Sequence, residues 1–555
     1  MSDGGLGMRR LRVAALWLLA LIPSAYCAWI AMDMPYLGQF HDASLYWVSA
    51  KSLAQGSGYR ILSLPGEPFQ TKYPPLYPLA LSLIWRAIPR FPDNLPLAAL
   101  VSWLFLPLYL LLARGVLADL GLGQRHRCVV LVLLALNPYV LVYATSVMSE
   151  LPFCCLLFGC LYLAARAGAP NSGVRMAAAA GALAGAAYLT RTAMLPALVS
   201  VPLWLVFRRR FRPAAVFCAA MLPAVLAWTL WVRAHPPPGT DPALLYYTDY
   251  LKFQFANFTW SDLPVVVAKN VEDLLTGIGG LIIPLELAAP LGGARLLEVL
   301  GLACILSAVR LAREKGTSQY HLFALGYVVL LLPWHMGNHQ RFLRLLFPVL
   351  PLLLAGVTRE VWRAVRFLAQ RLKTGRGADL ALAVPALTGV ALLCLWALAL
   401  NCITLACFPG FTRYNRAGLA SKEAAYRWIR ENTPAEALVL SEADPVLYLY
   451  TGRHGSSLII PPRLLYFGRP GDTARFVNTV AGYARARNMR YIVFNSLEGA
   501  PARHHVMNGE TVIAAPELRL VFQSARTSVY AVGELPGTHS TDVPVPATDG
   551  LKVQQ

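Results

Sequence analysis

The chain carries little charge for its length. Only 14% of its 555 residues are Asp, Glu, Lys or Arg, whereas 57% are hydrophobic and the mean hydropathy is +0.50. Ordinary soluble domains carry about 25% charged residues. Several apolar runs approach the ~20 residues that a helix needs to cross the hydrocarbon core of a bilayer. The composition therefore excludes an ordinary soluble protein and predicts a polytopic α-helical membrane protein.

Acidic residues are scarcer than basic ones. The chain has 29 Asp and Glu against 49 Lys and Arg, which gives a net charge of +20. Nucleic-acid binding would explain such an excess, but Lys and Arg also collect in the cytoplasmic loops of membrane proteins and set their orientation. The basic clusters fall between apolar runs, at Arg9–Arg12, 125–127, 208–210, 310–315 and 359–376. We therefore expect membrane lipids and no nucleic acid as partners.

Zinc-ligand spacings are missing from the chain. All ten cysteines lie between Cys27 and Cys407, mostly inside apolar runs, where cysteine usually acts as a small hydrophobe. No cysteine follows Cys407, so a disulfide-stapled C-terminal region is excluded. Motifs of the DxD type, which bind nucleotide sugars, are not apparent in the expected cytoplasmic loops. The GIGG at 277–280 lacks the lysine and the hydroxyl residue of a phosphate-binding loop.

Placing the basic clusters on the inside orders the apolar runs into about eleven spans. The first, about 11–31, has a long apolar run and no clear small-residue cleavage site, which favours a retained span over a signal peptide. The others lie near 96–117, 128–146, 151–166, 176–190, 194–207, 213–233, 296–311, 320–336, 342–358 and 380–405. With a cytoplasmic N-terminus, an odd number of spans puts the C-terminal region on the periplasmic or extracytoplasmic side.

The spans form a transmembrane domain over 1–410 with two long outer loops, at 32–95 and 234–294. Within the first loop, the apolar segment 73–91 could be a span, but its proline-rich start and two arginines favour a helix lying at the membrane interface. After 411 the hydrophobicity falls, and helix and strand patterns predict a small extracytoplasmic α/β domain over 411–535. We expect a disordered tail over 536–555.

Polar residues gather at the expected outer ends of the spans. They are His41, Asp42, Lys72, Tyr73, Glu150, Arg191, His335, His339, Arg341 and Arg344. An enzyme that uses an anionic lipid donor needs cations for a phosphate and a carboxylate as general base. Each residue also has an explanation that needs no catalytic or binding role. Asp42 fits a solvated turn or a helix N-cap, Glu150 and Arg191 fit a buried ion pair, and the others fit interfacial snorkelling. The outer aromatics Tyr46, Trp47, Tyr59 and Trp260 fit either sugar stacking or interfacial anchoring.

Several segments resemble the C-type glycosyltransferase superfamily, in particular bacterial members related to protein O-mannosyltransferases and lipid A aminoarabinose transferases. They cover most of the chain in order: HDASLYWVSAKSLAQGSGY, YPPLYPLALSLIW, NPYVLVYATSVMSELPF, AGALAGAAYLTRTAMLPAL, QRFLRLLFPVLPLLLAG and EAAYRWIRENTPAEALVLSEADPVLYLYTGR. The resemblance implies a C-type glycosyltransferase fold and a hexosyl- or pentosyltransferase of the bacterial inner membrane. It would move a sugar, with mannose the natural guess, from a polyprenyl-phosphate donor to a protein, lipid or envelope-glycan acceptor on the periplasmic side.

The resemblance also implies roles for single residues. Asp42 matches the first-loop acid that serves as catalytic base or orients the acceptor, and Glu150 matches the second-loop acid. Lipid A transferases carry a lysine directly before paired prolines, whereas this chain has Tyr73 there and Lys72 one residue earlier. The substrate-binding candidates, with Arg341 foremost for the lipid phosphate, are His41, Lys72, Tyr73, Arg191, His339, Arg341 and Arg344.

Two points stay open at this stage. Many relatives carry a second acid near the first-loop aspartate, but Ala43 follows Asp42 here, so no clear motif supports a divalent metal and no other cofactor is expected. The main alternative to a transferase is a lipid or glycan transporter or flippase. It predicts charged or broken helices at the bilayer midplane and two related halves. A non-catalytic membrane scaffold is a third reading.

Overall fold

A computed structural model of the chain describes residues 18–34, 37, 40–170, 173–256, 258–284, 293–335, 339–374, 378–496, 501 and 503–533. The expected tail over 536–555 and residues 11–17 of the expected first span lie outside these ranges. The chain divides into two compact units. The first consists of Met1–Tyr36, Tyr73–His235 and Phe258–Thr412, and the second of Leu37–Lys72, Pro236–Asn257 and Arg413–Gln555. The domain boundaries expected from the sequence stay a prediction.

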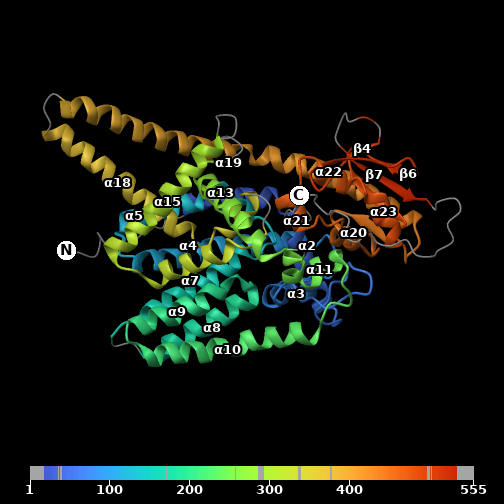
Figure 1. Cartoon of the computed structure of the whole chain (residues 1–555), viewed down its shortest axis with the longest axis horizontal. Coiled ribbons are helices and arrows are strands. Elements are labelled where there is room, and N and C mark those ends of the chain that lie inside the picture. Colours follow the sequence, from blue (N-terminus) through green and yellow to red (C-terminus); the bar gives the residue numbers. More distant parts are fainter. Residues whose placement is uncertain are drawn as a thin grey trace. The chain divides into compact units, whose positions relative to one another are not determined.

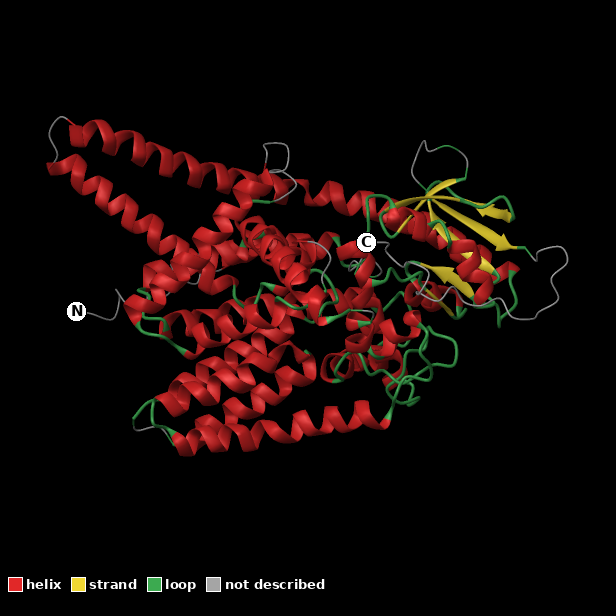
Figure 2. Ribbon diagram, in the orientation of Figure 1, coloured by secondary structure: helices red, strands yellow, loops and turns green. Residues whose placement is uncertain are grey.

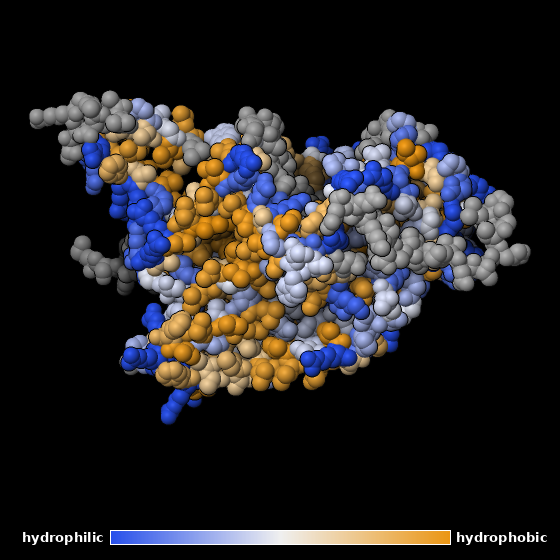
Figure 3. All heavy atoms as spheres, in the orientation of Figure 1, coloured by the Kyte–Doolittle hydropathy of each residue, from blue (hydrophilic) through white to orange (hydrophobic). Residues whose placement is uncertain are grey.

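Helices make up the described part of the first unit (Figures 1 and 2). They are Leu18–Ile30, α3 (Leu76–Ala87), α4 (Leu95–Asp119), α5 (Gln124–Ala135), α6 (Pro138–Ala144), α7 (Glu150–Ala167), α8 (Val174–Thr190), η1 (Thr192–Met194), α9 (Leu195–Phe207), α10 (Phe211–Ala234), η2 (Trp260–Asp262), α13 (Leu263–Ile282), α15 (Gly293–Lys315), α16 (Gln319–Leu331), α17 (His339–Leu345), α18 (Leu350–Thr374) and the first part of α19 (Ala378–Asn432). Figure 3 shows hydrophobic residues over much of the surface of this helical part. On α10, Leu222, Leu226 and Leu230 are exposed. Such a surface suits contact with lipid tails.

Four helices of the described residues are long and apolar enough to cross a membrane: α4, α7, α10 and the part of α19 from Ala383. A fifth arises if α5 and α6, which are bent by 62° at their junction, form one broken span. Shorter apolar helices are Leu18–Ile30, α8, Thr192–Phe207 and α16. Helices therefore occur at the places of the predicted spans, although a turn at 346–349 divides the predicted span 342–358 between α17 and α18. The count of eleven spans stays a prediction.

The junction of α5 and α6 is closed by one asparagine. The side-chain oxygen of Asn137 accepts hydrogen bonds from the backbone N–H groups of Tyr139 and Val140. Its amide nitrogen donates to the carbonyl oxygen of Leu281 at 2.8 Å. Pro138 occupies the first helical position, where its missing N–H costs nothing. The broken backbone is thus satisfied by protein groups, as it must be in a low-dielectric environment.

Helix α13 lies in a segment that the sequence reading assigned to the second outer loop. It packs against α15 in the first unit at very close range. A Cβ atom on Gly279 would lie 2.1 Å from the carbonyl oxygen of Leu297, so only glycine fits. Gly279 of the GIGG motif therefore serves helix packing, in the manner of small residues at membrane helix interfaces.

Helix α3 fits the interfacial placement expected for 73–91. Its 12 residues extend over about 18 Å, short of the ~30 Å of a hydrocarbon core. Leu79 and Leu83, one turn apart, are exposed, whereas Tyr77, Leu81 and Trp85 are buried. An apolar exposed stripe on a short helix favours a position along the membrane surface over a span.

The second unit contains a seven-stranded sheet and short helices (Figure 2). Its helices are α2 (His41–Ala54), α11 (Pro242–Thr248), α12 (Tyr250–Phe255), the end of α19, α20 (Asp444–Thr451), α21 (Pro462–Phe467), α22 (Asp472–Val477) and α23 (Val480–Ala486). The strands are β1 (Val439–Ser441), β2 (Gly455–Ser456), β3 (Tyr491–Asn495), β4 (His504–Met507), β5 (Glu510–Ile513), β6 (Leu518–Gln523) and β7 (Thr527–Val532). The small C-terminal sheet agrees with the α/β pattern of the sequence.

The sheet mixes parallel and antiparallel pairs. Strand β1 lies between β2 and β3 and is parallel to both, whereas β7 runs antiparallel to β3 and to β6. Strands β4 and β5 pair with each other, and β4 meets β3 at Asn495. Along β3, Ile492 and Phe494 enter one apolar cluster while Val493 enters another with Tyr426 of α19. Since neighbouring residues of a strand point to opposite faces, both faces of β3 are covered.

Candidate functional site

The His41-Asp42 pair begins helix α2. The N-cap of this helix is Phe40, and Asp42 lies in the first turn, where a negative charge is favourable. Asp42 is only 9% exposed. The structural reading of Asp42 as a solvated turn residue or an N-cap is therefore wrong, and Asp42 places a buried carboxylate in the first turn of α2.

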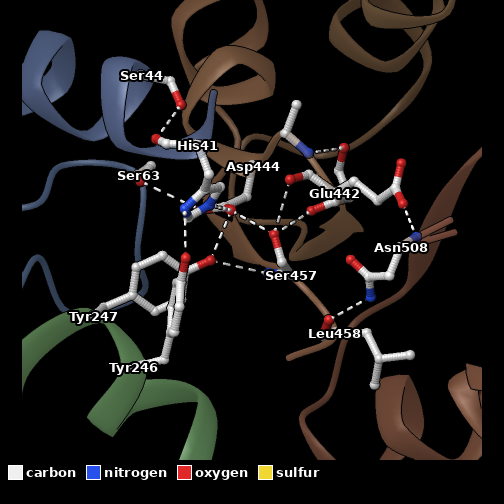
Figure 4. Close-up of polar contacts among 12 residues, drawn as sticks. His41, Ser44, Ser63, Tyr246, Tyr247, Glu442, Asp444, Ser457, Leu458 and Asn508 are labelled. Atoms are coloured by element: carbon white, nitrogen blue, oxygen red, sulfur yellow. Dashed lines mark hydrogen bonds and ion pairs between the residues drawn. The ribbon is translucent and has the colours of Figure 1, made fainter. Parts of the chain in front are cut away.

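His41 is held between two side chains of the second unit (Figure 4). Its Nε2 lies 3.1 Å from Oδ1 of Asp444, and its Nδ1 lies 3.3 Å from the hydroxyl of Tyr246. A carboxylate can only accept, so Nε2 carries the hydrogen of this contact. In the neutral ring, Nδ1 then accepts from Tyr246.

Asp444 is fully buried in the first turn of α20. Its Oδ1 also accepts from the hydroxyls of Tyr247 at 2.7 Å and Ser457 at 2.8 Å, and its Oδ2 lies 3.5 Å from Oγ of Ser63. Burial, together with the negative charge of Asp444, raises the pKa of Tyr247 well above its ordinary value, which keeps that hydroxyl a donor. The sequence reading did not single out Asp444.

Lys72 contacts the same tyrosine as His41. Its ammonium lies 3.6 Å from the ring centroid of Tyr246 and 4.3 Å from that of Tyr250, as a cation–π pair. Its backbone N–H donates to the side-chain oxygen of Gln70 at 3.0 Å. Tyr246 therefore brings together two residues that the sequence nominated separately, His41 through its hydroxyl and Lys72 through its ring.

Glu150 and Arg191 form a buried ion pair in the first unit. Oε1 of Glu150, at the start of α7, lies 2.8 Å from Nη1 of Arg191, and the two side chains are 3% and 15% exposed. Nη1 of Arg191 also donates to Oγ of Ser149 at 2.9 Å. The buried ion pair that the sequence analysis gave as the structural explanation of these two residues is thus formed. It places the carboxylate of Glu150 against the guanidinium of Arg191.

The remaining candidates fall in the first unit. Tyr73 precedes α3, and half-buried Arg344 belongs to α17. His335 is buried, with its ring centroid 3.7 Å from that of Phe258. The side chains of His339 and Arg341 lie outside the described part of the chain.

The outer aromatics separate into two groups. Tyr46, Trp47 and Tyr59 are buried in the second unit. They are therefore core residues, and neither sugar stacking nor interfacial anchoring describes them. Trp260 is 90% exposed, and both readings stay open for it. Among the described residues, no group of three or more His, Cys, Asp or Glu side chains is placed to hold a metal ion.

Comparisons with known proteins give structural matches only. No protein-family model matches the chain, and no curated protein matches it. The structure of ArnT from Cupriavidus metallidurans bound to undecaprenyl phosphate matches 96% of this chain and 99% of its own, with 16% identity and a TM-score of 0.49. The Archaeoglobus fulgidus oligosaccharyltransferase matches 87% of this chain and 69% of its own, with 13% identity and a TM-score of 0.49. The mycobacterial arabinofuranosyltransferase AftD matches 93% and 42%, with 15% identity and a TM-score of 0.41.

These matches are to glycosyltransferases, the kind of protein that the sequence resembles. They extend over most of the chain, but at identities of 13–16% and TM-scores below 0.5 they carry no conclusion about its activity or substrate. The roles of individual residues depend on the geometry of this chain alone.

Proposed function

We propose that this protein is an integral-membrane glycosyltransferase that moves a sugar from a polyprenyl-phosphate donor to an acceptor hydroxyl or amine. The observation that supports it most directly is the arrangement around Tyr246. Its ring lies 3.6 Å from the ammonium of Lys72, and its hydroxyl lies 3.3 Å from His41, the chain neighbour of buried Asp42. The side chain of Tyr246 thus contacts both the ammonium of Lys72 and His41, which precedes the acid Asp42 at the start of α2.

The chemistry needs both groups. The acceptor oxygen or nitrogen forms a bond to the anomeric carbon while the bond from that carbon to the phosphate oxygen breaks. The phosphate leaves with the electron pair, and attack from the opposite side inverts the anomeric centre. Asp42 takes the acceptor's proton as general base. The ammonium of Lys72 pairs with the phosphate of the bound donor and neutralises its charge as it leaves.

The first unit supplies further candidates. Glu150 is the second acid, and its pairing with Arg191 at 2.8 Å means that a donor phosphate would compete with a carboxylate for that guanidinium. Arg341 and Arg344 are therefore better candidates for the lipid phosphate, because arginine binds phosphate with two parallel N–H groups. Tyr73 and His339 remain candidates for contacts to sugar or lipid.

The finer assignment is that the enzyme lies in the bacterial inner membrane, with the N-terminus in the cytoplasm and the second unit in the periplasm. Mannose is the first sugar to try, and the acceptor is a protein, a lipid or an envelope glycan. Undecaprenyl phosphate, the lipid bound in the matched ArnT structure, is the first carrier to try. No metal or other cofactor enters this scheme.

The test is sugar transfer in membranes from a panel of radiolabelled polyprenyl-phosphate sugars. Wild type is compared at matched expression with Asp42→Asn, Glu150→Gln and Glu431→Gln, the last an exposed acid of α19 as control. Loss of a general base typically lowers the rate ~100-fold or more, so we expect Asp42→Asn to abolish transfer and Glu431→Gln to retain it. Full activity of Asp42→Asn would move the base elsewhere.

A transporter is the second candidate, and one observation favours it. The 62° break between α5 and α6 is the kind of interrupted helix that transporters place at substrate sites. The same membranes, reconstituted into vesicles with a fluorescent polyprenyl phosphate, distinguish the two functions. Lipid flipping without sugar transfer from any donor would overturn the transferase proposal.

A further inference from the structure

A buried acid joins three distant segments of the second unit. We call the Asp444 cluster the set His41, Ser63, Tyr246, Tyr247, Asp444 and Ser457 (Figure 4). His41 and Ser63 belong to the segment Leu37–Lys72, and Tyr246 and Tyr247 belong to α11. Asp444 and Ser457 belong to the C-terminal segment Arg413–Gln555, and all six residues lie within the second unit. A backbone hydrogen bond from the N–H of Gly455 to the carbonyl of Ser63, 3.0 Å long, holds the first and last segments together beside the cluster.

The hydrogen bonds of the cluster have a defined direction. The hydroxyl of Tyr247 accepts from the backbone N–H of Ser457 at 3.2 Å, so its own hydrogen is directed to Asp444. Nε2 of His41 donates to the same oxygen at 3.1 Å. A carboxylate with these donors is satisfied as an anion. His41 is thereby held in one tautomer and one ring orientation.

The series of contacts continues beyond His41. Nδ1 faces the hydroxyl of Tyr246 at 3.3 Å, and the ammonium of Lys72 lies 3.6 Å from the centroid of the Tyr246 ring. A path of consecutive contacts therefore runs from Asp444 through His41 and Tyr246 to Lys72. Asp42 follows His41 in the first turn of α2.

We propose that Asp444 is a positioning residue for the transfer reaction. It fixes His41 at the start of α2, next to Asp42, and through Tyr246 it fixes the ammonium of Lys72. This inference rests on the proposed function and deepens it, because it gives the C-terminal segment a part in catalysis beyond stability. Asp444 itself touches neither donor nor acceptor in this scheme.

A half-buried acid near Asp444 shows what a purely structural role looks like. Glu442 accepts hydrogen bonds from the backbone N–H of Asn508 and the amide of Asn495, both within the C-terminal segment. Burial raises the pKa of Glu442. It lies two positions before Asp444 and contacts no member of α2 or α11 through these bonds. Glu442→Gln is therefore the matched control.

The kinetic test compares Asp444→Asn, His41→Gln and the double variant in purified full-length protein. We expect Asp444→Asn to lower kcat by about tenfold or more. If Asp444 acts through His41, adding Asp444→Asn to His41→Gln lowers kcat by less than about threefold further, because effects of residues that act as a unit do not multiply. Glu442→Gln is expected to keep kcat within about threefold of wild type. Multiplicative losses in the double variant would overturn the inference.

A second readout does not need transferase activity. In protein labelled with ¹⁵N histidine, the His41 signal is assigned by its loss in His41→Gln. We expect wild type to show the Nε2–H tautomer and Asp444→Asn to change it, whereas Glu442→Gln leaves it unchanged. An unchanged His41 signal in Asp444→Asn would overturn the inference. Absence of transfer from any donor with wild type would instead overturn the proposed function, so the two failures are distinguishable.

Milder variants cover the case in which Asp444→Asn does not fold. Tyr247→Phe and Ser457→Ala each remove one hydrogen-bond donor from Asp444 and leave the carboxylate in place. Each is expected to lower kcat by about threefold in the wild-type background and to have no further effect in His41→Gln. Equal losses in both backgrounds would show a structural role and overturn the inference.

Discussion

The carboxylate of Glu150 lies 2.8 Å from the guanidinium of Arg191, with both side chains mostly withdrawn from solvent. Removing one member of such a pair leaves an uncompensated buried charge, which costs about 3–5 kcal/mol. We therefore expect Arg191→Met to lower the free energy of unfolding by about that amount. Adding Glu150→Leu should recover much of the loss, since neither charge then remains. Denaturant unfolding in detergent measures both effects.

The control for this pair is an ion pair on α15 whose arginine is exposed. Arg295 lies 2.8 Å from Glu298, but its side chain is largely in solvent. Such pairs contribute little to stability, so Arg295→Ala should leave the unfolding midpoint unchanged. A similar midpoint for Arg191→Met and wild type would show that Glu150 tolerates the loss of its partner.

Close packing of α13 against α15 predicts a steep cost for added methyl groups. A Cβ on Gly279 would lie 2.1 Å from the carbonyl oxygen of Leu297, and a Cβ on Gly301 would lie 2.1 Å from that of Leu275. Backbone must move to admit either atom, and overpacking of this kind costs about 1–3 kcal/mol. We expect Gly279→Ala and Gly301→Ala to melt at clearly lower temperatures than wild type.

The matched control is Gly389, a helical glycine of α19 around which a Cβ would meet no atom within 4 Å. Alanine is favoured over glycine in a helix by about 1 kcal/mol. Gly389→Ala should therefore melt at the wild-type temperature or slightly above it. Equal melting of all three variants would contradict the close approach of α13 and α15.

The phosphate contact proposed for Lys72 predicts that replacing this residue weakens donor binding. Replacing its ammonium by the uncharged thioether of Lys72→Met should raise the KM for the polyprenyl-phosphate sugar by about tenfold, the worth of one phosphate contact. Lys72→Arg keeps the charge and stacks on aromatic rings, so it should lose less. Transfer at varied donor concentration separates KM from kcat.

Lys51 offers the control for Lys72. Its ammonium also lies over a tyrosine ring, 5.0 Å from the centroid of Tyr448, in the same unit. It has no place in the proposed site, so Lys51→Met should leave the donor KM unchanged. A larger rise in KM for Lys51→Met than for Lys72→Met would place the phosphate elsewhere.

His505 makes the sheet sensitive to acid. Burial, with the nearby charges of His504 and Arg503, lowers the pKa of His505 to about 4 from its ordinary 6.5. The unfolded chain therefore binds more protons than the folded one between these pH values. The stability that neutral His505 contributes is complete above about pH 6.5 and is lost as the pH falls toward 4.

Hydrogen exchange of β3 and β4 in the full-length protein measures this dependence. Protection of these strands should fall between pH 6.5 and pH 4 in wild type. His505→Gln removes the titrating ring and should flatten that part of the profile. A profile that keeps its slope in His505→Gln would assign the effect to another group.

Local pattern was sufficient for most of the second unit's secondary structure. The segment EALVLSEADPVLYLYTGR predicts a strand, a turn and a short helix; β1 forms over Val439–Ser441, and α20 begins at Asp444 with Pro445 in the first turn. It ends at Thr451, and its C-cap is Gly452, whose φ of 70° favours glycine. The helix before Pro434 ends at Asn432, as the proline requires. These signals act within a few residues of one another.

Helix α13 was missed because it is amphipathic rather than uniformly apolar. It carries Lys269, Glu272 and Asp273, which prevent it from reading as a span. Its buried residues nevertheless recur every fourth position, at Val266, Asn270, Leu274 and Ile278. A search for helical periodicity, rather than for long apolar runs, would have found it.

The residues of the proposed site also divide into those that the sequence pattern indicated and one that it did not. His41, Asp42 and Lys72 were nominated from the sequence because charged groups next to an apolar run stand out. Asp444 was not found, because a buried acid stands out only by its partners, and its partner His41 is 403 positions away. Neither hydrophobic periodicity nor motif spacing indicates a contact between two residues so far apart in the sequence.

That separation has a consequence for how the protein is made. At about 5–20 residues per second, the 403 residues between His41 and Asp444 take about 20–80 s to synthesise. Throughout that interval the start of α2 has no acid to hold it, because Asp444 has not yet been synthesised. The Asp444 cluster can therefore form only after its C-terminal members, Asp444 and Ser457, have been made. A chain that stops short of Asp444 would insert its helices into the membrane and remain without an assembled site.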